Sequence, residues 1–319
     1  MNSLSSSAIS EFVVASEGIH ERWDVMIVAL GYEERSVHVA KEYSDRADTR
    51  VALAFGSSDT LSYGRNATIL EDLEFALESM PADVGRCVIN HVENVVSEVP
   101  RIAIDVSSFT RGHLAQIVDA LRFFRRACSI DFLYSPAGAS NWQGDVGPIT
   151  IAQPIHPGFT SWVDDPAAPL AALIGVGVED NLALGIAEYL DVSYAHAFVP
   201  VGGDAAFDSM NVEANSQFFL AEYTVRRSEY KLGDPFRLFL RLESLIYGMS
   251  PVIRVAIVPL GPKIFALCGL LAASVSGRSS TVWRFSSSNL ASPDERVAAG
   301  PIHSLRVEVV GSARNNDRT

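Results

Sequence analysis

Cysteine is scarce in this chain of 319 residues, and Cys87, Cys128 and Cys268 lie far apart, in or beside apolar runs. This distribution favours buried thiols in a reducing cytosol over a disulfide framework or a zinc site. The seven histidines show no metal-ligand spacing, either among themselves or with the cysteines. We therefore expect no bound metal and no cofactor.

Long apolar runs are also lacking. The longest, around 264–275, has about half of the roughly 20 residues that a membrane-spanning helix needs. Residues 1–12 do not join a basic start to an apolar stretch, as a signal peptide would. The sequence therefore predicts a soluble cytoplasmic protein without a membrane segment.

Positive charge is in deficit, because 25 Lys and Arg residues stand against 38 Asp and Glu residues, a formal net charge of -13. Binding along a nucleic-acid backbone needs a positive surface, so general nucleic-acid binding is not expected. A local basic pocket for one small anion is compatible with this charge. Hydrophobic residues make up 48% of the chain, enough for a substantial core. The polar ends are exceptions, and 313–319 is predicted to be a flexible tail.

Several standard motifs are absent. Gly175 and Gly177 are followed by Asp180 where the dinucleotide fingerprint needs a third glycine. The segment 261–264 lacks the spacing of a phosphate-binding P-loop. No Gly-x-Ser-x-Gly nucleophile elbow occurs. The function is therefore not given by any of these motifs.

The first half alternates continuous apolar runs, typical of buried strands, with amphipathic helical patterns. Strands are predicted at 25–30, 51–55, 87–90, 102–106 and 130–134, and helices at 33–43, 63–80 and 112–125. Such alternation indicates a parallel sheet covered by helices on both faces.

The second half repeats this plan, with helices at 182–190, 210–223, 236–249 and 264–276 and strands at 195–201, 252–258 and 282–285. Alignment of the first loops places Gly177 on Gly31, Glu179 on Glu33 and Asp180 on Glu34. Both halves also end on Gly-Pro-Ile, at 147–149 and 300–302. We predict an α/β protein of two tandem Rossmann-like units with mostly parallel sheets, related by internal duplication, at 1–157 and 170–312. Two unrelated α/β domains are the alternative.

In open parallel sheets, ligands bind beyond the carboxyl ends of the strands. Polar segments follow the first and fourth predicted strands, and weaker counterparts occur in the second half. The candidate ligand-binding residues are Gly31, Tyr32, Glu33, Glu34, Arg35, Ser36, Asp105, Ser107, Ser108, Thr110 and Arg111, with Glu179, Asp180, Gly261 and Lys263 in the second half.

These residue types suit an anionic ligand. Hydroxyls and free amides at a helix start can hold phosphate oxygens, and Arg111 suits phosphate or carboxylate. Glu33 and Glu34 would repel an anion, so they face sugar hydroxyls, a base amine or an arginine, or one is a general base. The candidate catalytic residues are Glu33, Glu34 and Asp105. The alternative is that all these residues cap helices or complement helix dipoles.

The segment 104–114, Ile-Asp-Val-Ser-Ser-Phe-Thr-Arg-Gly-His-Leu, resembles the loop after the fourth strand of CARF domains, the Rossmann-like ligand sensors of CRISPR-associated proteins. In that family two domains pair and bind a cyclic oligonucleotide across their junction, which a tandem duplication would do within one chain. The chain departs from the pattern, with Ser107 and Ser108 where glycines are frequent and Pro259 in the place of Asp105.

Three functions follow as hypotheses. The first is a nucleotide-type ligand sensor, with one cleft between the halves that passes its occupancy to a partner protein. The resemblance implies a bacterial defence or signalling setting. The second is a scaffold subunit of a multiprotein complex, and the third a phosphoester or glycosidic-bond hydrolase acting on a nucleotide. We expect a small nucleotide-like anion and a protein partner, with a homodimer as a further option.

Overall fold

The computed structural model describes residues 11–15, 18–55, 60–138, 148–160, 165–202, 205–276, 279–287 and 295–311. The predicted flexible tail 313–319 and Gly147 of the first Gly-Pro-Ile lie outside these residues. None of the helices in the described ranges is long and apolar enough to cross a membrane.

Among the described residues the first sheet has seven strands, and the five from β6 to β4 run parallel to one another. Their order is β1 (Glu11–Ala15), β13 (His303–Val310), β6 (Cys128–Tyr134), β5 (Arg101–Asp105), β2 (Trp23–Leu30), β3 (Ala47–Ala54) and β4 (Ala76–Ser79). The helices of this half are α1 (His38–Tyr43), α2 (Tyr63–Asp72), α3 (Val84–Glu93) and α4 (Arg111–Arg122).

The second sheet has six strands, in the order β10 (Thr224–Lys231), β9 (Tyr194–Val201), β8 (Leu170–Gly175), β11 (Arg254–Pro259), β12 (Thr281–Ser287) and β7 (Ile149–Pro154). Its helices are α5 (Leu182–Tyr189), α6 (Ala205–Ala214), α7 (Ser216–Leu220), α8 (Pro235–Gly248) and α9 (Lys263–Val275). The predicted fold class, two Rossmann-like units with mostly parallel sheets, is confirmed.

The two sheets share one topology. The second sheet, taken from β7, has the order β7-β12-β11-β8-β9-β10, and the first has β13-β6-β5-β2-β3-β4 with β1 added outside β13. In each half the first strand of the Rossmann-like unit, β2 or β8, is central. Its neighbour in the sheet, β5 or β11, is followed along the chain by the equivalent helix, α4 or α9. This one-to-one match is the arrangement that the aligned loops predict.

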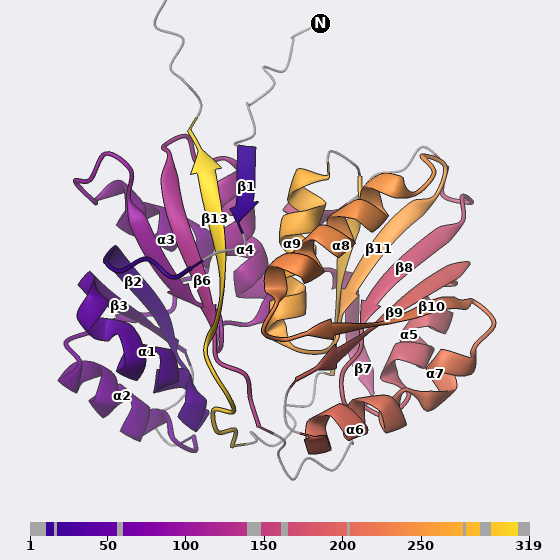
Figure 1. The fold of residues 1–319 in the computed structure, drawn as a ribbon, viewed down its shortest axis with the longest axis horizontal. Coiled ribbons are helices and arrows are strands. Elements are labelled where there is room, and N and C mark those ends of the chain that lie inside the picture. The colour runs from indigo at the N-terminus through magenta and orange to yellow at the C-terminus, as the bar shows by residue number, and fades with distance from the viewer. Residues whose placement is uncertain are drawn as a thin grey trace, which may run out of the picture.

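The equivalent strands β7 and β13 are exchanged between the halves. β7 pairs antiparallel with β12 in the second sheet, and β13 pairs antiparallel with β6 in the first. The predicted units 1–157 and 170–312 therefore do not coincide with the two sheets. Residues 149–154 belong to the second sheet and residues 303–310 to the first. In Figure 1 the yellow β13 runs beside β6 in the first half.

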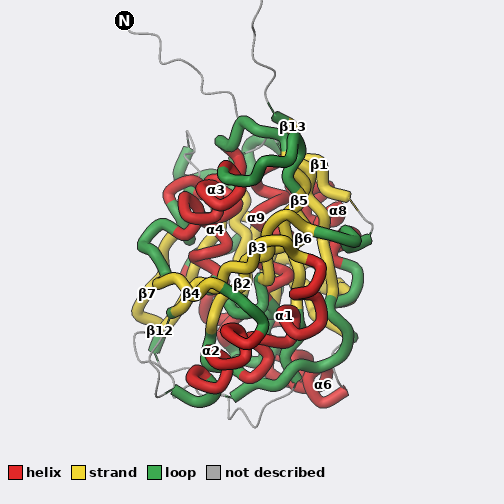
Figure 2. Tube along the Cα trace, turned by 90° about the vertical axis from the view of Figure 1, so that its left-hand side faces the viewer, coloured by secondary structure: helices red, strands yellow, loops and turns green. Residues whose placement is uncertain are grey.

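One hydrophobic cluster joins the halves. It contains Ile27 and Leu114 from the first half and Ile257 and Leu267 from the second. In Figure 1, α4, α8 and α9 lie between the two sheets, and α4 packs against α9. The opposite face of the first sheet, toward the viewer in Figure 2, carries α1 and α2. The central strands β2, β5, β8 and β11 are apolar without alternation because both of their faces are buried.

The sequence-based assignment fails between 72 and 93. The predicted helix at 63–80 ends at Asp72, because Glu74 adopts a left-handed conformation with φ 60° before β4 begins. The predicted strand at 87–90 is part of α3, whose N-cap Asp83 accepts a hydrogen bond from the Arg86 amide at 2.9 Å. Val84, Val88 and Val92 repeat every four residues and are all buried, as in a helix that faces the core.

Candidate functional site

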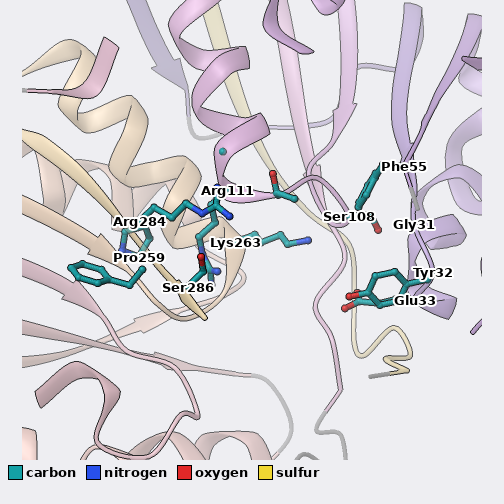
Figure 3. Close-up of a pocket in the computed structure, with 13 residues that line it drawn as sticks. Gly31, Tyr32, Glu33, Phe55, Ser108, Arg111, Pro259, Lys263, Arg284 and Ser286 are labelled. Atoms are coloured by element: carbon teal, nitrogen blue, oxygen red, sulfur yellow. The ribbon is translucent and has the colours of Figure 1, made fainter. Parts of the chain in front are cut away.

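A cleft of about 260 Å³ lies between the halves, at the carboxyl ends of the central strands of both sheets (Figure 3). It is the place where open parallel sheets hold ligands. Both halves contribute to its wall, which is formed by Gly31, Tyr32, Glu33, Phe55, Ser108, Thr110, Arg111, Gly112, Pro259, Lys263, Arg284, Phe285 and Ser286.

Two basic side chains cross between the halves in reciprocal fashion. Arg111, the first residue of α4, donates from Nη2 to the carbonyl oxygens of Leu260 and Gly261 at 2.6 and 2.5 Å. Lys263, the first residue of α9, donates from Nζ to the Ser107 carbonyl oxygen at 2.6 Å. Figure 3 shows Lys263 reaching toward the first half. Each cation therefore binds the loop that precedes the other helix.

The glycines of these loops permit close approach. A Cβ atom on Gly261 would lie 2.1 Å from the Val176 carbonyl oxygen, so the backbone could not keep its position with any larger residue. A Cβ atom on Gly31 would lie 3.2 Å from that of Ser108, where the two polar loops of the first half meet.

The acid Glu33 is already paired. Its carboxylate contacts Arg35 Nε at 2.6 Å and lies 4.0 Å from Arg296 Nε, and Arg35 also donates to the Ser135 carbonyl oxygen at 2.8 Å. Burial lowers the pKa of Arg35, but the charges of Glu33, Tyr134 and Asp105 and the hydrogen bond to Glu33 together outweigh it, and the net shift is upward. The sequence left open whether Glu33 faces sugar hydroxyls, a base amine or an arginine, or acts as a general base. In the structure its carboxylate faces an arginine.

Asp105 is fully buried and does not line the cleft. Its Oδ1 accepts hydrogen bonds from the amide and the hydroxyl of Ser107, and the Ser107 hydroxyl accepts one from the Ser135 amide at 2.8 Å. Burial raises the pKa of Asp105 to about 6 against these hydrogen bonds. Through these hydrogen bonds, Asp105 and Ser107 hold the loop after β5 against the end of β6.

The second-half acids occupy two different environments. Asp180 is exposed, whereas Glu179 is partly buried and acts electrostatically on Arg111. Burial raises the pKa of Glu179, and the charge of Arg111 opposes this rise. Burial also lowers the pKa of Lys263 to about 7, with Arg35 adding to the shift and Glu33 opposing it. Glu179 therefore attracts Arg111 electrostatically, just as Glu33 attracts Lys263. The two acids are also the residues that the sequence alignment places on each other.

Several polar groups on the cleft wall have no protein partner in the described part of the chain. The buried hydroxyls of Ser108 and Ser286 make no hydrogen bond there. Arg284 is exposed and forms no ion pair with a described residue. Phe55 adds an aromatic ring that meets His113 edge to face at 5.8 Å between centroids. The wall therefore offers a cation, two hydroxyls and an apolar ring to a small molecule.

The structure brings seven of the predicted residues to the cleft and leaves eight outside its wall. The seven are Gly31, Tyr32, Glu33, Ser108, Thr110, Arg111 and Lys263, and the eight are Glu34, Arg35, Ser36, Asp105, Ser107, Glu179, Asp180 and Gly261. The sequence-based set lacks Phe55, Gly112, Pro259, Arg284, Phe285 and Ser286. Phe55 and Phe285 end predicted strands, so the rule that ligands lie at strand ends could have found these two positions.

Three potential metal ligands meet away from the cleft. Oxygen of Glu78, sulfur of Cys87 and nitrogen of His91 all lie within 4.8 Å of one another. Burial and the charges of Glu78 and Asp83 raise the pKa of the Cys87 thiol. The histidines and cysteines were expected to have no ligand spacing, but Cys87 and His91 are four residues apart on α3.

Comparison with models of protein families and with curated proteins finds no match for this chain. The resemblance of 104–114 to CARF domains stays a prediction from those residues.

Proposed function

We propose that the chain is a binding module for a small nucleotide-type anion, held in the cleft between its two halves. The observation that carries this proposal is that two residues of the cleft wall, Ser108 and Ser286, have buried hydroxyls without a hydrogen-bond partner among the described residues. They come from opposite halves, so one ligand could bind both.

The energetics favour a polar ligand at this place. A buried polar group left without a hydrogen bond costs about 1–3 kcal/mol, which a phosphate oxygen would offset. Arg284 adds an exposed planar cation, and the N-termini of α4 and α9 both begin at the cleft wall. Phe55 offers a ring on which a base could stack. The volume of about 260 Å³ fits one small ligand.

Occupancy would be passed on through the crossing cations. Arg111 and Lys263 bind backbone carbonyls of the opposite half, and both line the cleft. An anion that attracts either cation competes with these bonds and changes how the halves are held together. A partner protein would read that change, and the CARF-like segment 104–114 supports a defence or signalling setting.

The test begins with the purified protein. Denatured protein is extracted and its small molecules are identified by mass spectrometry, and ligand-free protein is then melted with a panel of nucleotides. We expect Arg284→Ala to weaken nucleotide binding by about tenfold, which corresponds to 1.4 kcal/mol. Arg237→Ala is the matched control, since Arg237 is also an exposed arginine of the second half but is not part of the cleft wall. A protein that purifies empty and melts unchanged with every nucleotide contradicts the proposal.

A scaffold subunit is the second candidate, and the exchange of β7 and β13 favours it because the two halves form one body. On this view Arg111 and Lys263 serve only to hold the halves together. Co-purification of a partner protein that is unaffected by Arg284→Ala and by added nucleotide supports the scaffold over the sensor.

A hydrolase has less support. Asp105 is closed off from the cleft, and Glu33 is committed to Arg35. Product formation from a nucleotide panel, lost in Glu33→Gln while binding persists, is the result that would favour it.

A further inference from the structure

The secondary structure around Cys87 decides whether it can share a ligand with His91. In the strand expected at 87–90, residues four apart would be about 13 Å from each other along the chain. In a helix they lie on one face, with Cβ atoms about 6 Å apart. The segment is helix α3, so the thiol and the imidazole are neighbours on its surface.

Glu78 completes the group from a different element. It lies on β4, the edge strand of the first sheet, and its Oε2 is 3.2 Å from His91 Nε2. The ligand atoms of Glu78, Cys87 and His91 all lie within 4.8 Å of one another. Zinc bond lengths of about 2.0–2.3 Å place tetrahedral ligand atoms about 3.3–3.8 Å apart, so the distances in this group need to contract by at most about 1.5 Å.

The surroundings allow that contraction and favour a cation. The side chains of His91 and Glu78 are 22% and 40% exposed, which leaves them room to turn and gives solvent ions access. The neighbouring charges that act on Cys87 belong to Glu78 and Asp83, both acids. The N-cap of α3 is Asp83 and its fully buried face is formed by valines and Gly85, whereas Cys87 and His91 are only partly buried and Cys87 packs against the core.

We propose that Glu78, Cys87 and His91 form a Zn²⁺ site with one coordination position left for solvent. A thiolate, an imidazole and a carboxylate together select a borderline-soft metal over Mg²⁺ or Ca²⁺. On binding, the Cys87 thiol releases its proton to solvent and its sulfur bonds to the metal, with no change of oxidation state. The site fastens the edge strand β4 to α3, and none of its residues lines the cleft.

Thiol reactivity in the native protein tests this directly. Cys128 and Cys268 are 1% and 0% exposed, whereas Cys87 is partly buried, so a thiol-specific chromogenic reagent should modify one thiol per chain. After treatment with a chelator and its removal, micromolar Zn²⁺ should slow this reaction by at least tenfold, and Cys87→Ser should abolish it. A reaction rate that Zn²⁺ leaves unchanged overturns the proposal.

Co²⁺ provides the second measurement. Wild-type protein with Co²⁺ should show a thiolate-to-metal absorption band in the near ultraviolet, which Cys87→Ser removes and His91→Ala and Glu78→Gln weaken. Glu93→Gln is the matched control, because Glu93 is an exposed acid on the same helix. Zn²⁺ should also raise the melting temperature of wild type but not of Cys87→Ser. An unchanged Co²⁺ spectrum in Cys87→Ser or in His91→Ala contradicts this assignment of the ligands.

Discussion

Arg111 and Lys263 bind each other's loops: each is the first residue of its helix, and each donates to carbonyl oxygens of the segment that precedes the other's helix. Because α4 and α9 are equivalent in the two halves, these contacts are equivalent too. Both side chains also line the cleft. The proposed function therefore couples stability and ligand binding at the same two residues, and variants at and around them can separate the two effects.

Arg111→Ala should lower the free energy of unfolding by about 3 kcal/mol, since hydrogen bonds from a charged donor contribute about 1.5–3 kcal/mol each. Urea denaturation of the ligand-free protein measures the loss. Arg237→Ala, at an exposed arginine with 85% of its side chain accessible, is the control and should change stability by less than about 0.5 kcal/mol. Equal stability of the two variants would show that the crossing contacts contribute nothing.

Gly261→Ala should destabilise the protein by about 2 kcal/mol, because the added Cβ would lie 2.1 Å from the Val176 carbonyl oxygen and must move the backbone that Arg111 binds. Gly185→Ala on α5 is the matched control. An alanine there meets no atom within 4 Å, so it should stabilise the helix by about 0.5–1 kcal/mol. Melting temperatures of both variants that fall together would contradict the expected contrast.

Asp105→Asn should change how stability depends on pH. Burial raises the pKa of Asp105 from its ordinary value of 3.8 to about 6, so the folded state binds this proton more tightly than the unfolded chain. Its contribution to stability is therefore fully present below about pH 3.8 and is lost as pH rises through about 6. The shift corresponds to about 3 kcal/mol. Wild type should therefore lose most of this stability relative to Asp105→Asn, which does not ionise, between pH 4 and 7. Exposed Asp45→Asn should follow the wild-type curve.

Phe55→Leu should weaken the binding of a nucleotide by about tenfold, since stacking of a base on an aromatic ring contributes about 1–3 kcal/mol. Its effect on inorganic phosphate, which has no base, should be small. Titration calorimetry with both ligands separates these terms. Phe123→Leu, at a ring that is 47% exposed and outside the cleft wall, should leave both affinities unchanged. A parallel loss for nucleotide and phosphate would show that Phe55 shapes the cleft and does not stack.

Arg306→Ala tests the exchanged strand. Arg306 on β13 is paired with fully buried Asp131 on β6 at 2.8 Å, so its removal leaves a buried charge and should cost about 3–5 kcal/mol. Arg22→Ala removes a surface arginine from its pair with Asp48, where both side chains are more than half exposed, and should cost less than about 1 kcal/mol. Chemical denaturation compares the two. Similar losses would show that the β13–β6 contact is not an essential part of the first sheet.

Much of the fold could be predicted because its signals are local. Apolar runs such as 25–30 identify strands buried on both faces, and the Leu114 pattern identifies α4. The alignment of Glu33 with Glu179 predicts that the two acids are equivalent, and in the structure each acts electrostatically on the basic residue that begins a helix of the other half. The segment 72–93 could not be assigned in this way, because the left-handed turn at Glu74 interrupts an apolar spacing that otherwise continues.

The sequence by itself determined two α/β units of one plan and the polar loops at their strand ends. Tertiary structure alone decided that β7 and β13 change places, because the sheet that such a strand joins depends on the partner it pairs with and not on its own residues. It also decided which polar residues line the cleft: Asp105 turns into the core to hold its loop, while Arg284 and Ser286 arrive from the other half. The pairings of β7 with β12 and of β13 with β6 join residues more than 100 positions apart, a separation over which periodicity and spacing carry no information.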